Sequence, residues 1–221
     1  MDDRLVFAKD KQSKYISHLD LMRTFQRGFS RAGIQIKHTE GFNPHPFVSI
    51  GLPLSVGYSS QCELMEFGLV AGCTHEELPQ KLTAVMPTGI EILECYRGEQ
   101  KLKHIAFVTY HIAMHYDNGK SEEGCKALQS LLEQESHIIE KKSKKAKSGS
   151  VKLDIIPHIR SFELSCEGET VTLKAILSAQ NPGLNPELIR KALTDSHPEL
   201  APDFVTCHRE SILDKDGNLF R

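Results

Sequence analysis

The segment RLVFAKDKQSKYISHLDLMRTFQRGFSRAGIQIKH, from Arg4 to His38, decides the fold that the sequence predicts. Residues 4–8 form a short apolar run typical of a strand, and residues 34–38 form a second one, with Ile34 and Ile36 on one face. Apolar residues between these runs recur at the spacing of a helix face: Met22, Phe25, Phe29 and Ala32. The segment therefore predicts a strand, a helix and a strand in succession.

The predicted helix has a start signal and a stop signal. Ser17 can cap its first turn, and Asp20 stands three residues later, as in a capping box with Asp in place of Glu. Gly33 follows the last apolar position, where glycine can adopt the left-handed backbone that ends a helix.

The same order of elements recurs along the chain. The first half continues with predicted strands over 47–54 and 64–70, a turn over 58–61, a helix over 75–85 and a strand over 90–96. The second half predicts a strand over 104–116, a helix over 122–134, a strand over 137–140 and a hairpin over 161–178. A helix over 185–193, with Asn185 as its cap and Pro186 at its first position, and a strand over 204–213 follow. Each half follows the βαββαβ order of a ferredoxin-like unit with one extra strand.

We therefore predict an α+β protein of two tandem ferredoxin-like domains, with mainly antiparallel sheets and helices on one face. The polar link GEQKLK separates an N-terminal domain at 1–98 from a C-terminal domain at 103–221. A chain of 221 residues with 39% hydrophobic residues can bury a sizeable core without disulfides or metal.

Charge and hydropathy exclude several classes of protein. The net charge of −2 gives no overall attraction for nucleic acid or anionic lipid, so binding of a polyanion needs a local patch. No apolar run approaches the ~20 residues of a membrane span, and the start MDDRLVFAKD lacks the apolar core of a signal peptide. We expect no membrane association and a cytoplasmic location.

Cysteine spacing and known motifs argue against metal and cofactor chemistry. The six cysteines stand singly, without a CxxC pair: Cys62, Cys73, Cys95, Cys125, Cys166 and Cys207. We expect them to fill small gaps in the core of a protein in a reducing compartment, with no cofactor. The chain lacks P-loop, Rossmann, HExxH and GxSxG motifs, so the sequence predicts no catalytic residue.

Two features of the predicted first helix point to anion binding. Arg23, Arg27 and Arg31 are four residues apart and share one face, and the arginine fork suits phosphate. The alternative is a solvated face whose arginine stems cover the edge of the core. His18 and Asp20 lie in the first turn, where free N–H groups favour an anion. His18 is then either an acid, base or donor, or a local capping residue.

The segment GFNPHP, Gly41 to Pro46, predicts a stiff loop. Pro44 and Pro46 restrict the backbone on both sides of His45, and Asn43 before a proline starts a turn. The loop is either a rigid connector or a site that presents Asn43 and His45. No pair among His18, Asp20 and His45 has the close helical spacing of zinc motifs, so we predict no metal site.

A basic segment lies in the second half of the chain. Its lysines are Lys141, Lys142, Lys144, Lys145 and Lys147. Such a segment either contacts RNA phosphates or is a solvated loop.

The motifs YISHLDLMRTFQRGFSRAGI and EGFNPHPFVSIGLPLSVG, with SQCELMEFGL and NPELIRKAL, resemble one bacterial family along nearly the whole chain. The family is that of the radical-SAM-linked (radical-SAM-associated) proteins, a domain of unknown function. Its motif falls here on Ser17, His18, Leu19, Asp20, Arg23, Arg27, Arg31, Gly41, Phe42, Asn43, Pro44, His45, Pro46, Pro53, Leu54 and Gly57. Gly28 departs from the alanine that is usual in the family.

The resemblance implies a partner. The family occurs beside, or fused to the C-terminal end of, a radical SAM protein with a cobalamin-binding-like domain, and often near genes for an E/G-type ribonuclease and ribosomal proteins. That implies a radical SAM partner and suggests RNA or the ribosome. The chain itself lacks the radical SAM CxxxCxxC motif, so we do not expect it to be an enzyme on its own.

Three functions remain open at this point. The first is an accessory module that binds RNA or a ribosomal component through a set of binding residues, namely His18, Asp20, Arg23, Arg27, Arg31, Asn43 and His45. The second is a protein–protein adaptor that binds no RNA. The third is a metal-independent RNA endonuclease, by analogy with CRISPR RNA-processing proteins, in which His18 or His45 is the general acid or base.

Overall fold

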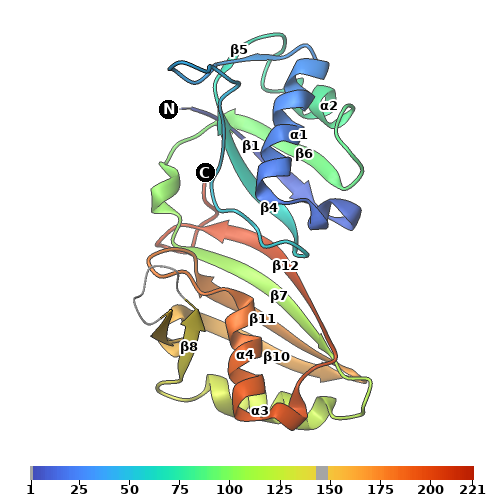
Figure 1. Cartoon of the computed structure of the whole chain (residues 1–221), viewed down its shortest axis with the longest axis vertical. Coiled ribbons are helices and arrows are strands. Elements are labelled where there is room, and N and C mark those ends of the chain that lie inside the picture. Colours follow the sequence, from blue (N-terminus) through green and yellow to red (C-terminus); the bar gives the residue numbers. More distant parts are fainter. Residues whose placement is uncertain (1, 143–148) are drawn as a thin grey trace. The chain divides into compact units, whose positions relative to one another are not determined.

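The computed structural model describes residues 2–142 and 149–221 (Figure 1). Lys144, Lys145, Lys147 and the side chain of Lys142, which belong to the basic segment, lie outside the described residues. The chain divides into two compact units. The first consists of Met1–Ile105, Arg209–Asp214 and Asn218–Arg221, and the second of Ala106–His208 and Lys215–Gly217.

The first unit combines a sheet with helices on one of its faces (Figure 1). Its elements are β1 (Asp3–Lys9), η1 (Lys11–Tyr15), α1 (His18–Arg31), β2 (Gln35–Ile36), β3 (Val48–Ile50), β4 (Ser59–Phe67), β5 (Leu69–Ala71), α2 (Leu78–Thr83), β6 (Ile90–Arg97) and η2 (Leu102–His104). β1 lies between β4 and β6, and β3 pairs with β4, with every one of these pairs antiparallel. β2 and β5 form a small separate sheet.

The second unit repeats this plan. Its elements are β7 (Phe107–His115), α3 (Ser121–Leu132), β8 (Ile138–Lys142), β9 (Ser150–Asp154), η3 (Ile156–His158), β10 (Ile159–Glu167), β11 (Thr170–Ser178), α4 (Pro186–Ser196), η4 (Pro198–Leu200) and β12 (Phe204–Leu213). The strand order is β10-β11-β7-β12, and β8 and β9 form a hairpin apart from this sheet.

The predicted α+β class with mainly antiparallel sheets is confirmed. In each unit the four principal strands, numbered along the chain, lie in the order 4-1-3-2: β6-β1-β4-β3 and β12-β7-β11-β10. This order supports two split βαβ units, while the ferredoxin-like assignment itself stays a prediction.

The division of the chain differs from the predicted ranges 1–98 and 103–221. The boundary lies between Ile105 and Ala106, and Arg209–Asp214 belong to the first unit. The cause is that the ten-residue strand β12 neighbours β7 and then β4, so its last residues pack with the first unit. Strand periodicity identifies β12 but does not show which strand it pairs with.

Two local predictions are wrong. The turn predicted over 58–61 is mostly part of β4, because Ser60 pairs with Lys9 of β1 and both are buried. A polar run therefore continues the sheet instead of ending it. β9 was not predicted, although Val151 and Leu153 alternate with polar residues along this short strand.

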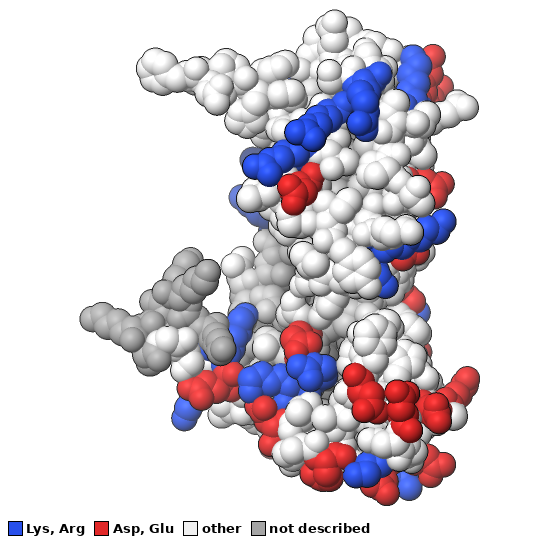
Figure 2. All heavy atoms as spheres, turned by 45° about the vertical axis from the view of Figure 1, so that its right-hand side comes forward, with Lys and Arg blue, Asp and Glu red and all other residues white. Residues whose placement is uncertain are grey.

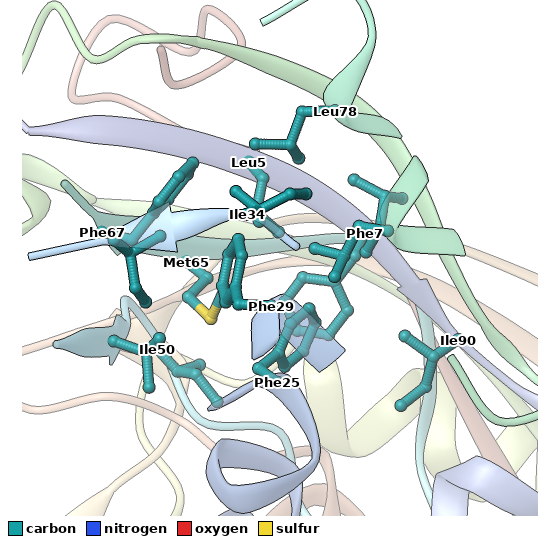
Figure 3. Packing of buried hydrophobic residues seen from close by; sticks show 14 of the residues in the cluster. Leu5, Phe7, Phe25, Phe29, Ile34, Ile50, Met65, Phe67, Leu78 and Ile90 are labelled. Atoms are coloured by element: carbon teal, nitrogen blue, oxygen red, sulfur yellow. The ribbon is translucent and has the colours of Figure 1, made fainter. Parts of the chain in front are cut away.

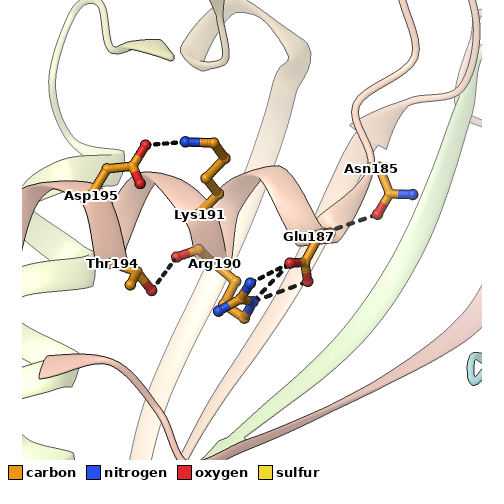
Figure 4. A network of polar contacts seen from close by, with 6 residues as sticks. All are labelled: Asn185, Glu187, Arg190, Lys191, Thr194 and Asp195. Atoms are coloured by element: carbon orange, nitrogen blue, oxygen red, sulfur yellow. Dashed lines mark hydrogen bonds and ion pairs between the residues drawn. The ribbon is translucent and has the colours of Figure 1, made fainter. Parts of the chain in front are cut away.

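The ends of the helices agree with the predicted caps. In α1 the Ser17 side chain accepts a hydrogen bond from the Asp20 N–H at 3.2 Å, and Gly33 after the helix has a φ of 68°. In α4 the Asn185 side chain accepts one from the Glu187 N–H at 2.9 Å (Figure 4). The exposed face of α4 also carries the pair Arg190–Glu187. Local capping thus fixes where both helices begin.

The core of the first unit lies between α1 and the sheet (Figure 3). Phe25 packs edge-on against Phe7 with ring centroids 4.8 Å apart, and Phe29 lies 5.1 Å from Phe67. Met22, predicted to face the core, is only partly buried at its edge. Elsewhere all six cysteines are free; Cys207 is buried and the other five are half-buried.

Gly28 has a packing role. A Cβ atom at this position would lie 2.8 Å from the sulfur of Met86 and 3.3 Å from Leu82. The absent side chain lets α1 approach α2 closely.

Five charged side chains are buried among the described residues of the first unit, namely Arg4, Lys9, Glu63, Arg209 and Asp214, and three of them interact with one another. Lys9 continues the inward face of Leu5 and Phe7 and donates to the carbonyls of Lys14 at 3.2 Å and Ile16 at 3.1 Å. Arg209 donates to Glu63 at 2.8 Å. Burial lowers the pKa of Lys9, and nearby Glu63 acts in the opposite direction. Glu63 thus balances two buried cations.

Candidate functional site

The three arginines of α1 form one exposed row, which we call the Arg row. Arg23, Arg27 and Arg31 are all exposed, and Figure 2 shows Lys and Arg side chains in a continuous diagonal row over this helix. Each four-residue step advances by ~6 Å along the helix axis. The row therefore offers guanidinium groups at nearly regular intervals on one surface.

The three arginines differ in their local partners. Arg23 pairs with Asp20 at 3.2 Å, and both side chains are more than 60% exposed. Arg31 donates to the backbone carbonyl of Val85. Within the described residues, Arg27 has no hydrogen-bond or ion-pair partner. It is thus the member of the Arg row with the most freedom to bind an external anion.

The start of α1 is a capping arrangement. The Asp20 carboxylate accepts hydrogen bonds from the Ser17 hydroxyl at 2.7 Å and from Arg23 at 3.2 Å. The hydrogen bond from Ser17, followed by that from Arg23, lowers the pKa of Asp20. His18 beside it is half-buried. Asp20 therefore holds the helix start and offsets part of the charge of Arg23.

The GFNPHP segment is the tip of a small hairpin, which we call the GFNPHP hairpin, residues 37–47. The Thr39 N–H donates to the His45 carbonyl at 2.8 Å, and the Phe47 N–H donates to the Lys37 carbonyl at 2.8 Å. Residues 40–44 form the tip, where Gly41 has a φ of 122° that few other residues adopt. The predicted loop is thus held by backbone pairing as well as by its prolines.

His45 is oriented by its own hairpin. Its Nδ1 atom lies 3.1 Å from the Thr39 hydroxyl and 3.2 Å from the Asn43 carbonyl oxygen. A carbonyl oxygen only accepts hydrogen bonds, so the contact with Asn43 requires the proton on Nδ1. In the neutral ring, Nε2 is then an acceptor facing outward from this network. The side chains of both Asn43 and His45 are exposed.

One hydrogen bond joins α1 to the hairpin. The Gln26 side-chain amide donates to the Pro46 carbonyl at 3.0 Å. A groove of about 630 Å³, the α1–hairpin groove, lies between Gln26 and Ser30 on the helix and Lys37 and His38 on the hairpin. The GFNPHP hairpin and the helix that carries the Arg row therefore line one groove and lie on adjoining surfaces.

The predicted site residues form two groups. Arg23, Arg27 and Arg31 share α1 with His18 and Asp20, while Asn43 and His45 share the hairpin. No contact joins His18 to His45 within the described part of the chain. His18 precedes Gln26 by eight residues, or ~12 Å along the helix axis. The structure also holds no cluster of His, Cys, Asp and Glu side chains suited to a metal ion among its described residues.

Three residues of this surface were missed by the sequence analysis. Gln26 links helix and hairpin, Lys37 adds a cation to the groove, and Phe42 is fully exposed at the hairpin tip. The alternation of Ile34 and Ile36 could have placed Lys37 on the outer face. An aromatic residue inside a Gly-Asn-Pro turn, outside any apolar period, could have marked Phe42.

The comparisons with known proteins concern family and fold. Residues 4–186 match the family "Uncharacterized protein conserved in bacteria (DUF2344)". The chain belongs to this family. The resemblance implied a bacterial domain of unknown function, and the match to DUF2344 confirms that part of the prediction. The association with a radical SAM protein stays a prediction. No curated protein matches the chain. No helix in the described residues is long and apolar enough to cross a membrane.

Two solved structures are similar to this DUF2344 chain. A chain of the "Crystal Structure of a Cbf5-Nop10-Gar1 Complex" is 8% identical with a TM-score of 0.53; the match covers 96% of this chain and 49% of that one. The "Crystal Structure of an Unknown Protein from Galdieria sulphuraria" is 9% identical with a TM-score of 0.26 and covers 94% and 98%. This chain thus spans about half the length of the first structure, and that likeness shows the fold alone.

Proposed function

We propose that the chain is an accessory module that binds RNA through the Arg row and the GFNPHP hairpin and serves a radical SAM partner in the bacterial cytoplasm. The observation that carries the proposal is the exposed Arg row, with Arg27 unpaired among the described residues, beside a hairpin tied to the same helix by Gln26. The arginine fork binds phosphate groups through paired hydrogen bonds.

The charge of this surface supports the binding of RNA even though the net charge of the whole chain is slightly negative. The Arg row and Lys37 supply cations, against the carboxylates of Asp20 and Glu40. Such a patch attracts a polyanion locally, over a distance of about one Debye length, ~10 Å at 0.1 M salt. Exposed Asn43 and His45 add hydrogen-bonding groups beside it.

The proposal of a radical SAM partner rests on the family resemblance. The sequence supports different roles for the two proteins. The chain has no CxxxCxxC motif for the cluster of a radical enzyme. Its contribution to such a partnership is therefore binding and presentation of the RNA. We infer no reaction for the chain on its own.

Replacing Arg27 with alanine tests this proposal. We expect Arg27→Ala to weaken binding of a fluorescein-labelled single-stranded RNA about 10-fold or less at low salt, because one phosphate contact is lost. Arg97→Ala, which removes another exposed arginine of the first unit, is the matched control and should bind like the unaltered protein.

Fluorescence anisotropy measures both affinities. Equal affinities for the Arg27 and Arg97 variants, or no RNA binding by the unaltered protein, would reject the proposal. If RNA binding is absent and the chain still captures the purified radical SAM protein, the adaptor function replaces it.

A further inference from the structure

Phe42 is a large apolar side chain that the fold leaves fully in water. It lies at the tip of the GFNPHP hairpin, with a relative exposure of 111%, and contributes nothing to the core of the first unit. Covering an exposed phenylalanine on binding removes apolar surface from water and so favours the complex. The ring is therefore a ready contact for a ligand that approaches the hairpin.

The hairpin presents this ring on a stiff support. Backbone hydrogen bonds of 2.8 Å close the base of the tip, and Pro44 and Pro46 restrict the chain after Phe42. The Thr39 hydroxyl lies 3.2 Å from the His45 N–H, and Gln26 fixes Pro46 to α1. A preorganised support lowers the entropy that is lost when the ring is covered.

The groups around Phe42 match a nucleotide. Asn43 is exposed next to the ring and has both donors and an acceptor, and His45 offers Nε2 as an acceptor. Lys37 lies at the base of the hairpin and lines the α1–hairpin groove, and the Arg row lies on α1, which also lines this groove. Aromatic, amide and cationic groups thus occur together, as stacking on a base and binding of its phosphate require.

We propose that Phe42 stacks on an unpaired base, so that the RNA bound by this surface is single-stranded. The inference rests on the proposed RNA-binding function and names its substrate class. In a double helix the flat faces of the bases are covered by their neighbours, and the A-form major groove is too narrow for a side chain. Only unpaired nucleotides expose a face to a ring held at a hairpin tip.

The charges favour RNA over a protein as the partner of this ring. Aromatic residues also anchor protein interfaces, but Lys37 lines the groove beside the hairpin, and the helix that lines the same groove carries the Arg row. Glu40 is the one acidic residue within the hairpin, residues 37–47. Since its carboxylate repels phosphate, removing that charge should strengthen binding of RNA.

The test compares single-stranded and double-stranded RNA of the same sequence, with the unaltered protein, Phe42→Ala and Glu40→Gln. Phe42→Ala should bind single-stranded RNA about 5- to 100-fold more weakly, from ~1–3 kcal/mol per stacked base at ~1.4 kcal/mol per tenfold. Its affinity for the duplex should be unchanged. Glu40→Gln should bind single-stranded RNA more tightly. Phe42→Leu should lose nearly as much affinity as Phe42→Ala, because leucine keeps the apolar area but has no ring that can stack on a base.

The outcomes separate this inference from the function on which it rests. Equal losses for single-stranded and duplex RNA, or no loss, overturn the stacking role while the proposed function stands. Absence of RNA binding by the unaltered protein rejects both. Full affinity in Phe42→Leu shows an apolar contact without stacking and also overturns the inference. Circular dichroism of each variant confirms that it folds, as expected for a fully exposed residue.

Discussion

Replacing the whole Arg row, Arg23→Ala, Arg27→Ala and Arg31→Ala together, should weaken binding of single-stranded RNA about 100-fold at 0.1 M salt. Three phosphate contacts contribute about 2 to the slope of log K against log salt concentration, at ~0.7 per contact. Losing that part of the slope lowers the affinity for RNA by a factor of about 100 at 0.1 M salt and changes it little at 1 M salt. Affinities measured by anisotropy over a salt series give both quantities.

A matched triple variant controls for net charge. Arg97→Ala, Lys101→Ala and Lys103→Ala also remove three exposed cations from the first unit. We expect this control to keep the salt slope of the unaltered protein. If both triple variants lose the same slope, RNA is attracted by general charge and the Arg row has no special role. Among the single variants of the Arg row, Arg27→Ala should lose the most affinity for RNA, since Arg23 and Arg31 have partners within the fold.

Glu63→Ala should lower the free energy of unfolding by about 3–5 kcal/mol, because it leaves buried cations without their counter-charge. Glu63 is 1% exposed, Arg209 3% and Lys9 1%. Arg209→Met should lower the free energy of unfolding by less, because Glu63 still has the charge of Lys9 nearby. Urea denaturation at neutral pH, followed by circular dichroism, gives the two free energies.

The double variant Glu63→Leu with Arg209→Met tests the cause. Replacing a buried ion pair with apolar residues is often nearly neutral, so part of the loss should return. The stability that the double variant still lacks comes from Lys9, whose buried charge has no carboxylate beside it. A larger loss in Arg209→Met than in Glu63→Ala would contradict the assignment of Glu63 as the shared counter-charge.

Elements with strong local signals could be predicted from the sequence. The start of α1 was predicted from Ser17 and Asp20, and that of α4 from Asn185 with Pro186 after it, because a cap acts on neighbouring residues. The strand β12 was predicted at its observed bounds. In these cases the signal and the structure occupy the same few residues.

Features that depend on distant pairs could not be predicted. The link between Gln26 and Pro46 spans 20 positions, and the pair of Glu63 and Arg209 spans 146. Lys9 lies just beyond the apolar run predicted over 4–8, yet it continues the buried face of β1. Its burial depends on carbonyl acceptors supplied by the turn after it, which strand periodicity does not show.

The candidate site shows the same limit. The residues of the Arg row and of the GFNPHP segment were identified from spacing and motif. Their arrangement as adjoining surfaces follows from the hairpin and its bond to Gln26, which no local pattern encodes. The fully exposed position of Phe42 likewise depends on where the hairpin points relative to the core of its unit.

Ultraviolet cross-linking of the unaltered protein to single-stranded RNA, with the cross-linked peptides identified by mass spectrometry, tests the central claim most directly. The claim is that the Arg row and the GFNPHP hairpin form one RNA-binding surface. We predict cross-links in the peptides that contain residues 18–31 and 37–47, with Phe42 or His45 among the modified residues. Cross-links confined to other peptides, or none under conditions where RNA binds, would contradict the claim.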